Sequence, residues 1–546
     1  MKLKNRFLKN KLSMCISASI ASLVSSTYAD AQVQIEEIVV TSSFIDRTLD
    51  EIINPLHIVN GEEISSSATQ SLGETLDGLL GVSSADYGSA VGQPIIRGLS
   101  GGRVKVLNNG MVVRDVSGLG GDHNVEIDLN NVDQIEVVRG PSSLLYANGG
   151  IGGIVNIVDS TIAREDFSES DLRLGLESQS VNDGETYDFS YQNNMGGLNF
   201  SLGYKKSQFG DFDIPDGAVL HDEEEHEEDH EEGHEDEGHE ENLGYLMNSD
   251  SETETKRFGV SKVGDWGYFG VSVNNNESLY GIPFHGDDEH DEHDEHDEHD
   301  DHDDDHDDDH EEEGHDEHEG ERIFSKTNSD VINLAGAFNF DNSWIKRIDY
   351  SVRDSDYALT EQHAEGKEGH EEQGHEDHEE GPTTFTNNAR EYWTTFDIST
   401  DSFSQKMVLN VVDEDTSVIG AEAFMQPTET KEKSIGYYLS TDLDLFHLDF
   451  GARYEQISRD GSVVHREEEH DDHDDDHDDD HDDDHDDDHD DDHSEDIDSF
   501  NKDFNNSSLA LSIGRDINEN VDINFGISRV ERAPNAVELF MNGPHL

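Results

Sequence analysis

Residues Val132–Val158 read VDQIEVVRGPSSLLYANGGIGGIVNIV, and this stretch decides the fold. It opens with apolar residues at alternate positions, Ile135 and Val137, which predicts a strand. Arg139-Gly140-Pro141 ends that strand, because proline has no N–H to donate to a neighbouring strand. A short apolar turn and four glycines then lead into a second predicted strand, Ile154–Val158. The stretch therefore predicts a tight hairpin whose backbone turns sharply at glycine.

The glycine spacing of this hairpin also resembles that of loops that bind phosphate. Such loops need Gly-Lys-Ser/Thr and a long helix behind it, and this stretch has neither. We therefore reject a phosphate site. The simplest interpretation of the residues alone is a glycine-rich hairpin in an ordinary α/β or β domain, without a binding function.

A second motif, Pro94-Ile95-Ile96-Arg97-Gly98, lies upstream of the hairpin. Together with IEVVRGPSSLLYANGGIGGIVNIV it resembles the plug domain of TonB-dependent outer-membrane receptors. The resemblance runs from Ile35 to Leu546, is strongest up to Asn156, and is closest to the zinc receptors of the ZnuD type. It implies a mainly β protein, in which an N-terminal α/β plug domain precedes an antiparallel β-barrel in the outer membrane of a Gram-negative cell.

The N-terminal residues 1–31 have the features of a secretory signal peptide. Five basic residues precede Leu12–Val24, a mostly apolar stretch that is too short and too rich in serine to span a bilayer. Ala29-Asp30-Ala31 offers a cleavage site with small residues. Cys15, the single cysteine, lies in this leader, so the mature chain can have no disulfide and no thiolate metal site.

Residues 32–54 are predicted to hold a Ton box and a linker. A short β-prone segment near a free terminus can add itself to the edge of a partner's sheet. By resemblance, this segment is the one that the inner-membrane partner TonB binds and pulls, and the alternative is a first strand of the plug. The residues predicted to bind TonB are Ile38, Val39, Val40 and Thr41.

Residues 55–160 are predicted to form the compact plug. Ser71 and Glu74 have the spacing of a helix N-cap, and the apolar residues that follow have helical periodicity. Asn109-Gly110 predicts a turn between two short strands. Next comes the glycine loop Gly118-Leu119-Gly120-Gly121-Asp122-His123. Its histidine could be an ordinary buried side chain, but ZnuD-type receptors carry an Asp-His pair here, which implies a metal ligand.

From residue 168 to the end at 546 the pattern predicts a barrel. No further segment has the roughly 18 apolar residues of a helical span, so a membrane protein with this sequence must cross as strands. Long segments alternate between apolar or aromatic residues and small or polar ones, as lipid-facing and lumen-facing positions do. A soluble sandwich would have shorter strands and loops. Thirteen strands are predicted, starting near residues 171, 184, 197, 255, 266, 328, 344, 385, 404, 431, 446, 504 and 519.

Four runs rich in histidine and acidic residues, at 221–241, 285–321, 363–380 and 465–496, hold 27 of the 31 histidines and 68 of the 129 acidic residues. They follow the third, fifth, seventh and eleventh predicted strands, so in an antiparallel meander all four leave from the same side. Long loops outside and short turns inside are the outer-membrane arrangement. Because Asp is a poor helix former and like charges repel, we expect the runs to be disordered without metal.

The four runs are predicted to capture metal ions. A plain acidic tract, or a weak Ca²⁺ or Mg²⁺ sponge, is the alternative, but acidity alone does not require a histidine every three or four residues. Imidazole selects Zn²⁺, Cu²⁺, Ni²⁺ or Co²⁺ over hard cations, and capture should weaken below about pH 6.5, where the ring is protonated. The predicted ligands in the runs are His221, His226, His230, His285, His290, His293, His296, His299, His363, His473, His477 and His481.

A tight transport site is predicted near the plug. The resemblance implies Asp122 and His123 from the plug, Glu361 at the start of the third run, and His545 from a late-barrel motif that begins at Arg532. The transported or bound metal is predicted to be Zn²⁺, with ligand distances of about 2.0–2.2 Å. No other cofactor is expected.

The sequence therefore predicts an outer-membrane receptor that imports zinc or a similar divalent metal, with TonB and lipid as partners. Import of haem or a metal chelate and a surface metal buffer are the alternatives. The net charge of −94 argues against nucleic acid, and no motif of enzyme catalysis is present. Since the family's barrels have about nine more strands, the resemblance also implies a fragment or truncated product.

Overall fold

The computed structural model describes residues 39–40, 47–48, 57–67, 69–88, 90–130, 132–146, 149–215, 218, 244–283, 323–341, 343–363, 381–421, 423–443, 445–465, 496–518 and 521–542. The predicted signal peptide, the Ton box residues Ile38 and Thr41, and almost all of the four histidine-rich runs lie outside these residues, as does His545. The chain divides into two compact units, 1–39 and 40–546, and the second is described below. Two short strands open the described part, β1 (Val39–Val40) and β2 (Arg47–Thr48).

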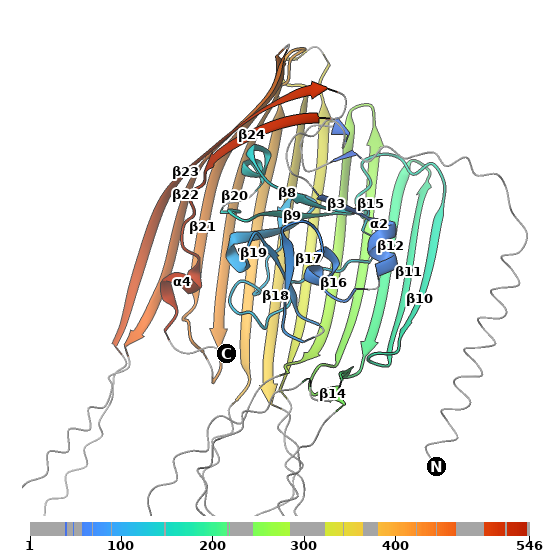
Figure 1. Ribbon diagram of the computed structural model, residues 1–546, viewed down its shortest axis with the longest axis vertical. Helices are drawn as coiled ribbons and strands as arrows, with labels where there is room; N and C mark the ends of the chain where they lie inside the picture. The colour runs from blue at the N-terminus through green and yellow to red at the C-terminus, as the bar shows by residue number, and fades with distance from the viewer. Residues whose placement is uncertain are drawn as a thin grey trace, which may run out of the picture. The chain divides into compact units, whose positions relative to one another are not determined.

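Thirteen strands form one antiparallel sheet and follow one another in chain order (Figure 1). The prediction of thirteen antiparallel barrel strands behind a plug is thus confirmed. A separate two-stranded hairpin, β13 (Phe212–Asp213) with β14 (Tyr245–Leu246), interrupts the series. The thirteen strands are β10 (Asp171–Gln179), β11 (Gly184–Met195), β12 (Leu198–Phe209), β15 (Ser251–Gly264), β16 (Gly267–Gly281), β17 (Ile323–Asn339), β18 (Arg347–His363), β19 (Thr383–Asp397), β20 (Ser404–Ile419), β21 (Thr428–Leu443), β22 (Phe446–His465), β23 (Asp496–Asn518) and β24 (Val521–Arg529).

Several strands extend further towards the histidine-rich runs than the sequence pattern predicts. β23 begins at Asp496 rather than near residue 504, and β22 and β23 stay paired as far as His465 and Asp496. The predicted fourth run, 465–496, therefore begins and ends within strands, and His363 is likewise the last residue of β18. Ladder hydrogen bonds join backbone groups, so a strand can continue after its apolar alternation has ended.

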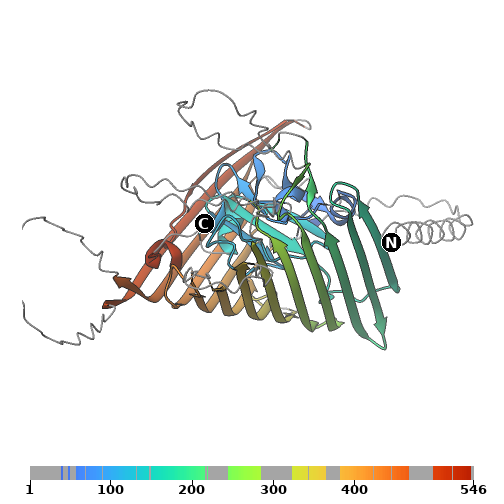
Figure 2. The ribbon, with the colours of Figure 1, turned by 90° about the horizontal axis from the view of Figure 1, so that it is seen from below.

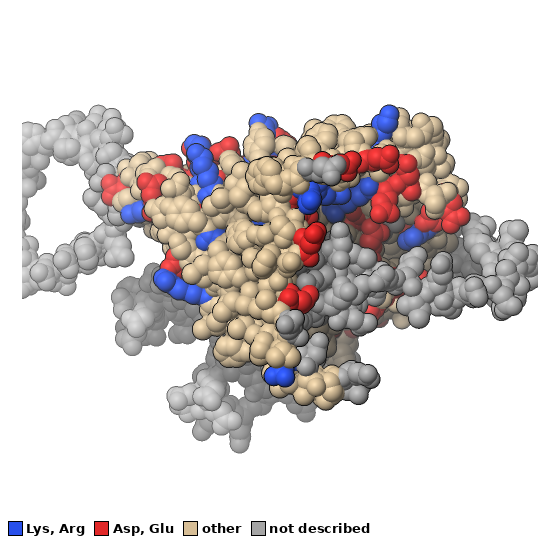
Figure 3. All heavy atoms as spheres, turned by 90° about the horizontal axis from the view of Figure 1, so that it is seen from above, with Lys and Arg blue, Asp and Glu red and all other residues tan. Residues whose placement is uncertain are grey.

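The two faces of the sheet differ in the way a lipid-facing wall requires. Large apolar side chains point outward, and Leu174 and Phe525 are 73% and 68% exposed. Small polar side chains point inward, such as Ser201 and Ser325, and these are buried. Seen from the end with the short turns, acidic and basic side chains are mixed over a largely uncharged surface (Figure 3). Among the described residues, no helix has the length and apolar character needed to cross a membrane.

The plug contains a five-stranded sheet in the order β3-β8-β9-β6-β7 and a pair of strands, β4 and β5. β8 (Gln134–Val138) and β9 (Gly153–Val158) are the predicted glycine-rich hairpin, and they pair antiparallel. The other elements are β3 (His57–Asn60), α2 (Gly61–Ser67), α3 (Leu72–Leu76), β4 (Val82–Asp86), β5 (Gly92–Ile96), η2 (Gly101–Arg103), β6 (Val104–Asn108), β7 (Met111–Val112) and η3 (Pro141–Leu145).

Local sequence signals in the plug act as predicted. The Ser71 side chain accepts a hydrogen bond from the Glu74 N–H and so caps α3. Asn109 and Gly110 have φ angles of 51° and 85°, the left-handed pair that a tight hairpin turn requires. Leu76 and Ile135 are fully buried in the core that these elements enclose.

The plug lies on the side enclosed by the curved sheet (Figure 2). Arginines on the inner face of the wall donate hydrogen bonds to plug carbonyls, Arg353 to Asn108 at 3.1 Å and Arg257 to Asp128 at 2.6 Å. At Gly451 the strand approaches the carbonyl oxygen of Pro141 so closely that any side chain would collide with it. The backbone of the plug is thus held directly against the wall.

Candidate metal centre

A closed loop of the plug, residues 113–123, carries the predicted Asp-His pair, and we call it the ligand loop. It starts directly after β7. The Asp115 carboxylate accepts hydrogen bonds from the Ser117 N–H at 3.1 Å and the Ser117 hydroxyl at 2.7 Å. Its second oxygen accepts one from the Glu126 N–H at 3.0 Å, just beyond the loop. Asp115 therefore ties the two ends of the loop together.

A glutamine from β5 fixes the interior of the ligand loop. Nε2 of Gln93 lies 2.9–3.0 Å from the carbonyl oxygens of Ser117, Gly120 and His123, and these three acceptors share its two N–H groups. Gln93 is buried, so water competes little for these bonds. This single amide therefore sets the path of the backbone that leads to His123.

Three potential ligands converge where the ligand loop meets the wall. Nε2 of His123 lies 3.2 Å from Oε1 of Glu361, on β18, and 3.7 Å from Oδ2 of Asp122. One ligand atom from each of the three residues lies within 4.8 Å of the others. The side chains of His123, Asp122 and Glu361 are 0%, 3% and 5% exposed. It is the one such group among the described residues.

The orientation of the imidazole is set from behind. Nδ1 of His123 lies 3.0 Å from the carbonyl oxygen of Val116, which can only accept a hydrogen bond. Nδ1 therefore carries the proton, and in a neutral ring the lone pair of Nε2 points at the two carboxylates. A carbonyl behind one ring nitrogen is the usual support for a histidine that binds metal through the other.

The walls around the three side chains are apolar and aromatic. The ring of Phe385 meets the His123 ring edge-on at 4.7 Å, and Phe424 packs behind Phe385. The Tyr280 hydroxyl donates to the Asp122 carbonyl oxygen at 3.4 Å. In such surroundings the electrostatic attraction between a cation and its ligands is strong, because little water screens the charges.

The electrostatics of the group favour positive charge. Burial alone would lower the pKa of His123, but the hydrogen bond with Glu361 and the charges of Asp122 and Glu361 outweigh burial and raise it. A proton on Nε2 therefore stabilises the two carboxylates when no metal is present. A divalent cation at the same point would do so more strongly.

The structure thus brings together three of the four residues of the predicted tight site. The fourth, His545, lies outside the described residues, but the motif before it can be followed. Asn535 caps α4 (Ala536–Phe540), and the Asn542 N–H donates to the carbonyl oxygen of Phe424 at 2.7 Å. Asn542, the last described residue, therefore lies beside Phe424 of the aromatic cluster next to His123. The predicted run ligands, apart from the backbone of His363, also lie outside the described residues.

Sequence reasoning missed the residues that support the ligands, chiefly Gln93, Asp115 and Val116. Asp115 did carry a usable signal, since an aspartate side chain favours an Asx turn by accepting a hydrogen bond from the backbone N–H two residues on. Gln93 had no such signal. Its partners lie in a loop that only the folded plug brings near.

Comparisons with known proteins agree with this fold. Residues 48–154 match the family model described as TonB-dependent Receptor Plug Domain. The chain is 28% identical over 161 residues to the vitamin B12 transporter BtuB of Photobacterium profundum, and the match covers 29% of this chain and 26% of that protein. The chain therefore spans about a quarter of the length of this curated relative.

Solved structures match over most of the chain. The copper transporter OprC has a TM-score of 0.57 at 12% identity, covering 88% of this chain and 64% of OprC. The haemophore receptor HasR of Serratia marcescens has a TM-score of 0.61 at 11% identity, covering 90% of this chain and 65% of HasR. At these identities the likeness shows the fold alone. The similar proteins are transporters and receptors, not enzymes.

Proposed function

We propose that the protein binds a divalent transition metal, in the first instance Zn²⁺, between its plug and its barrel, and imports it across the outer membrane with energy from TonB. The observation that carries this proposal is the orientation of His123. The Val116 carbonyl occupies Nδ1, and Nε2 faces Asp122 and Glu361 at 3.7 and 3.2 Å.

The donor set suits zinc. One imidazole nitrogen and two carboxylate oxygens are ligands that Zn²⁺ takes at about 2.0–2.2 Å, so a bound ion would draw the three side chains together. His545 is proposed as the fourth ligand. The same donors also bind copper, nickel and cobalt, and intrinsic affinity favours copper over zinc, so geometry and supply must select the metal.

The direction of transport follows from the order of the parts. Histidines in the four runs would hold ions at high local concentration and pass them inward. The buried site then takes the ion between plug and wall. Tension on the Ton box segment would move the plug, separate Asp122 and His123 from Glu361, and release the ion.

The test is zinc accumulation in metal-starved source cells that carry the wild-type gene, no gene, or a variant lacking residues 38–41. A strain without TonB is the parallel control. Uptake that needs the gene, the segment 38–41 and TonB would support energised import. Zinc binding that persists while uptake does not depend on any of them would instead indicate a metal buffer. If zinc uptake is unchanged throughout, nickel, copper and haem are measured in the same strains.

A further inference from the structure

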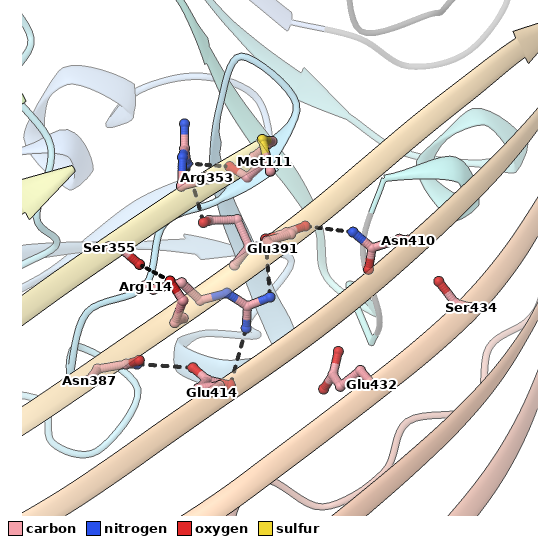
Figure 4. Close-up of polar contacts among 12 residues, drawn as sticks. Met111, Arg114, Arg353, Ser355, Asn387, Glu391, Asn410, Glu414, Glu432 and Ser434 are labelled. Carbon is pink, nitrogen blue, oxygen red and sulfur yellow. Dashed lines mark hydrogen bonds and ion pairs between the residues drawn. The ribbon is translucent and has the colours of Figure 1, made fainter. Parts of the chain in front are cut away.

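One largely buried arginine ties the ligand loop to the barrel wall. Arg114 is the second residue of the loop, and its guanidinium reaches into a group of wall carboxylates (Figure 4). Nη2 lies 3.3 Å from Oε2 of Glu391, on β19, and Nη1 lies 3.2 Å from Oε2 of Glu414, on β20. The side chains of Arg114, Glu391 and Glu414 are 11%, 3% and 16% exposed.

The charge of Arg114 is strongly held. Burial opposes a positive charge, but the carboxylates of Glu414, Glu391 and Glu432 outweigh burial and raise the pKa of Arg114. Without the guanidinium, these carboxylates would face one another in a buried space. Removing Arg114 from such a group is costly, because Glu391 and Glu414 lose the guanidinium that they contact. Only the charges of neighbours such as Arg459, which lies 3.5 Å from Glu432, then remain to balance them.

The same carboxylates connect to the backbone of the ligand loop. Nδ2 of Asn387, on β19, donates to Oε1 of Glu414 at 3.0 Å and to the carbonyl oxygen of Asp115 at 2.8 Å. Asn410 donates to the other oxygen of Glu391 at 2.7 Å. Arg114 and Asp115, neighbours in sequence, are therefore held at one point of the wall.

This point of attachment acts on the metal ligands through a short path. Asp115 closes the ligand loop, and the next residue, Val116, supplies the carbonyl that orients His123. Glu361 comes from the wall and the other two ligands from the plug. The site is therefore complete only when plug and wall are in register.

We propose that Arg114 is a positioning residue of the metal site: it seats the ligand loop on β19 and β20 so that Asp122 and His123 meet Glu361. The inference rests on the proposed function, because it presumes that these three side chains bind a metal. Arg114 itself does not touch the ion. Its effect is on affinity and on the geometry of binding.

The experiment measures zinc binding at this site by hydrogen exchange of the peptide spanning residues 113–126, in the whole protein in detergent. Free Zn²⁺ is set by a chelator buffer, so protection of the peptide gives a dissociation constant that the histidine-rich runs do not obscure. Arg114→Gln is expected to weaken binding by about 10- to 100-fold, the usual effect of removing an outer-shell support. Arg114→Lys should recover part of the loss, because it keeps the charge without the forked geometry.

A second wall–plug arginine provides a matched control. Arg453 is also buried, and it donates to the carbonyl oxygens of Leu144 and Leu145 at 3.3 and 3.2 Å, far along the chain from the ligand loop. Arg453→Gln should leave the dissociation constant within about twofold, a change smaller than RT in free energy. Equal weakening by both variants would mean that Arg114 only stabilises the plug, and would overturn the inference.

The two proposals fail in different ways. Wild-type affinity in Arg114→Gln, together with loss of binding in His123→Ala, would overturn the role of Arg114 and leave the metal site intact. Protection that is absent in the wild-type protein would overturn the metal site and the inference together. Cobalt absorption spectra provide a second readout once the histidines of the four runs are replaced with asparagine in every variant, so that the runs do not contribute to the spectrum. Displaced ligands then change the spectrum of the buried site, while unfolding only lowers the amount of bound ion.

Discussion

Nε2 of His123, in the plug, lies 3.2 Å from Oε1 of Glu361, in the barrel wall. Neither element alone holds the three converging side chains. The plug contributes an imidazole oriented by its own backbone, and the wall contributes a carboxylate that also accepts a hydrogen bond from Ser325 at 3.1 Å. Any ion bound there would bridge two parts of the protein that the proposed transport must separate.

Replacing Glu361 with glutamine should abolish tight metal binding while leaving the fold intact. The amide keeps the shape of the side chain but loses the negative charge and is a poor zinc ligand. We expect affinity to fall by at least about 100-fold, beyond the usual effect of losing an outer-shell partner. The measurement is the zinc-dependent protection of residues 113–126, and Glu277→Gln, at an exposed position of β16, is the control.

The metal affinity of the buried site should depend on pH in a higher range than that of the runs. The raised pKa of His123 means that a proton competes with metal at pH values where an ordinary histidine is already neutral. When the solution is acidified from high pH, the metal affinity should therefore already be falling before pH 6.5 is reached. Titrations of residues 113–126 between pH 8.5 and 5.5 test this. An affinity that stays constant down to pH 6.5 would contradict the prediction.

Without metal, the same group should affect stability in the opposite sense. Because the folded pKa of His123 is raised, its contribution is complete below the ordinary value of 6.5 and is lost as pH rises through the folded value. Unfolding of the metal-free plug, followed by hydrogen exchange, should thus show a loss of stability above pH 6.5 that His123→Gln lacks.

Glu126→Gln should stabilise the plug near neutral pH. Burial raises the pKa of Glu126 to about 8, with help from Asp115 and Asp128 and against the hydrogen bond from Asn276. The unfolded chain ionises this group above about pH 4.5 and the folded protein does not, so wild-type stability falls between pH 4.5 and 8 by about 1.4 kcal/mol per unit. The variant escapes this loss. The measurement is the free energy of unfolding of the wild type and the variant at pH 5 and pH 8, and the difference between the two proteins should be larger at pH 8. Glu165→Gln, at an exposed position, is the control.

Replacing the histidines of the four runs with asparagine should impair uptake only when zinc is scarce. The acidic residues remain, so the change removes imidazole ligands and leaves the charge. We expect uptake at limiting zinc to fall by at least about tenfold, because the local store of ions is lost. Uptake at abundant zinc and the affinity of the buried site should not change. Equal uptake at every zinc concentration would show that the runs play no part in capture.

The strands of the wall could be predicted because most of them contain a stretch in which exposed apolar side chains alternate with small or polar ones. Leu172, Leu174 and Leu176 show this period plainly. The ends of β17 and β23 nearest the histidine-rich runs could not be predicted, since the backbone pairing continues there among polar and charged residues that show no apolar alternation. The hairpin of β13 and β14 was also missed, because two residues on each side are too few to show any period.

The candidate site divides in the same way. Asp122 and His123 lie in a recognisable glycine loop, although their role as ligands was predicted from the resemblance to a family. Glu361 was predicted from that resemblance alone, since nothing in the sequence around it links it to the plug. Arg114 and Asn387 were not predicted at all. Their importance arises from contacts between distant parts of the chain, and no local period or spacing records such contacts.

The division of ligands between plug and wall has a mechanical consequence. A metal that binds only the seated arrangement stabilises it by RT ln(1 + [M]/Kd), about 2.7 kcal/mol when free metal is a hundred times the dissociation constant. Moving the plug away from the wall then requires that much more work when metal is bound than when the site is empty. In the proposed import, TonB would have to supply this difference each time it moves a loaded plug. The work that TonB can deliver would then set an upper limit on the affinity that the site can usefully have.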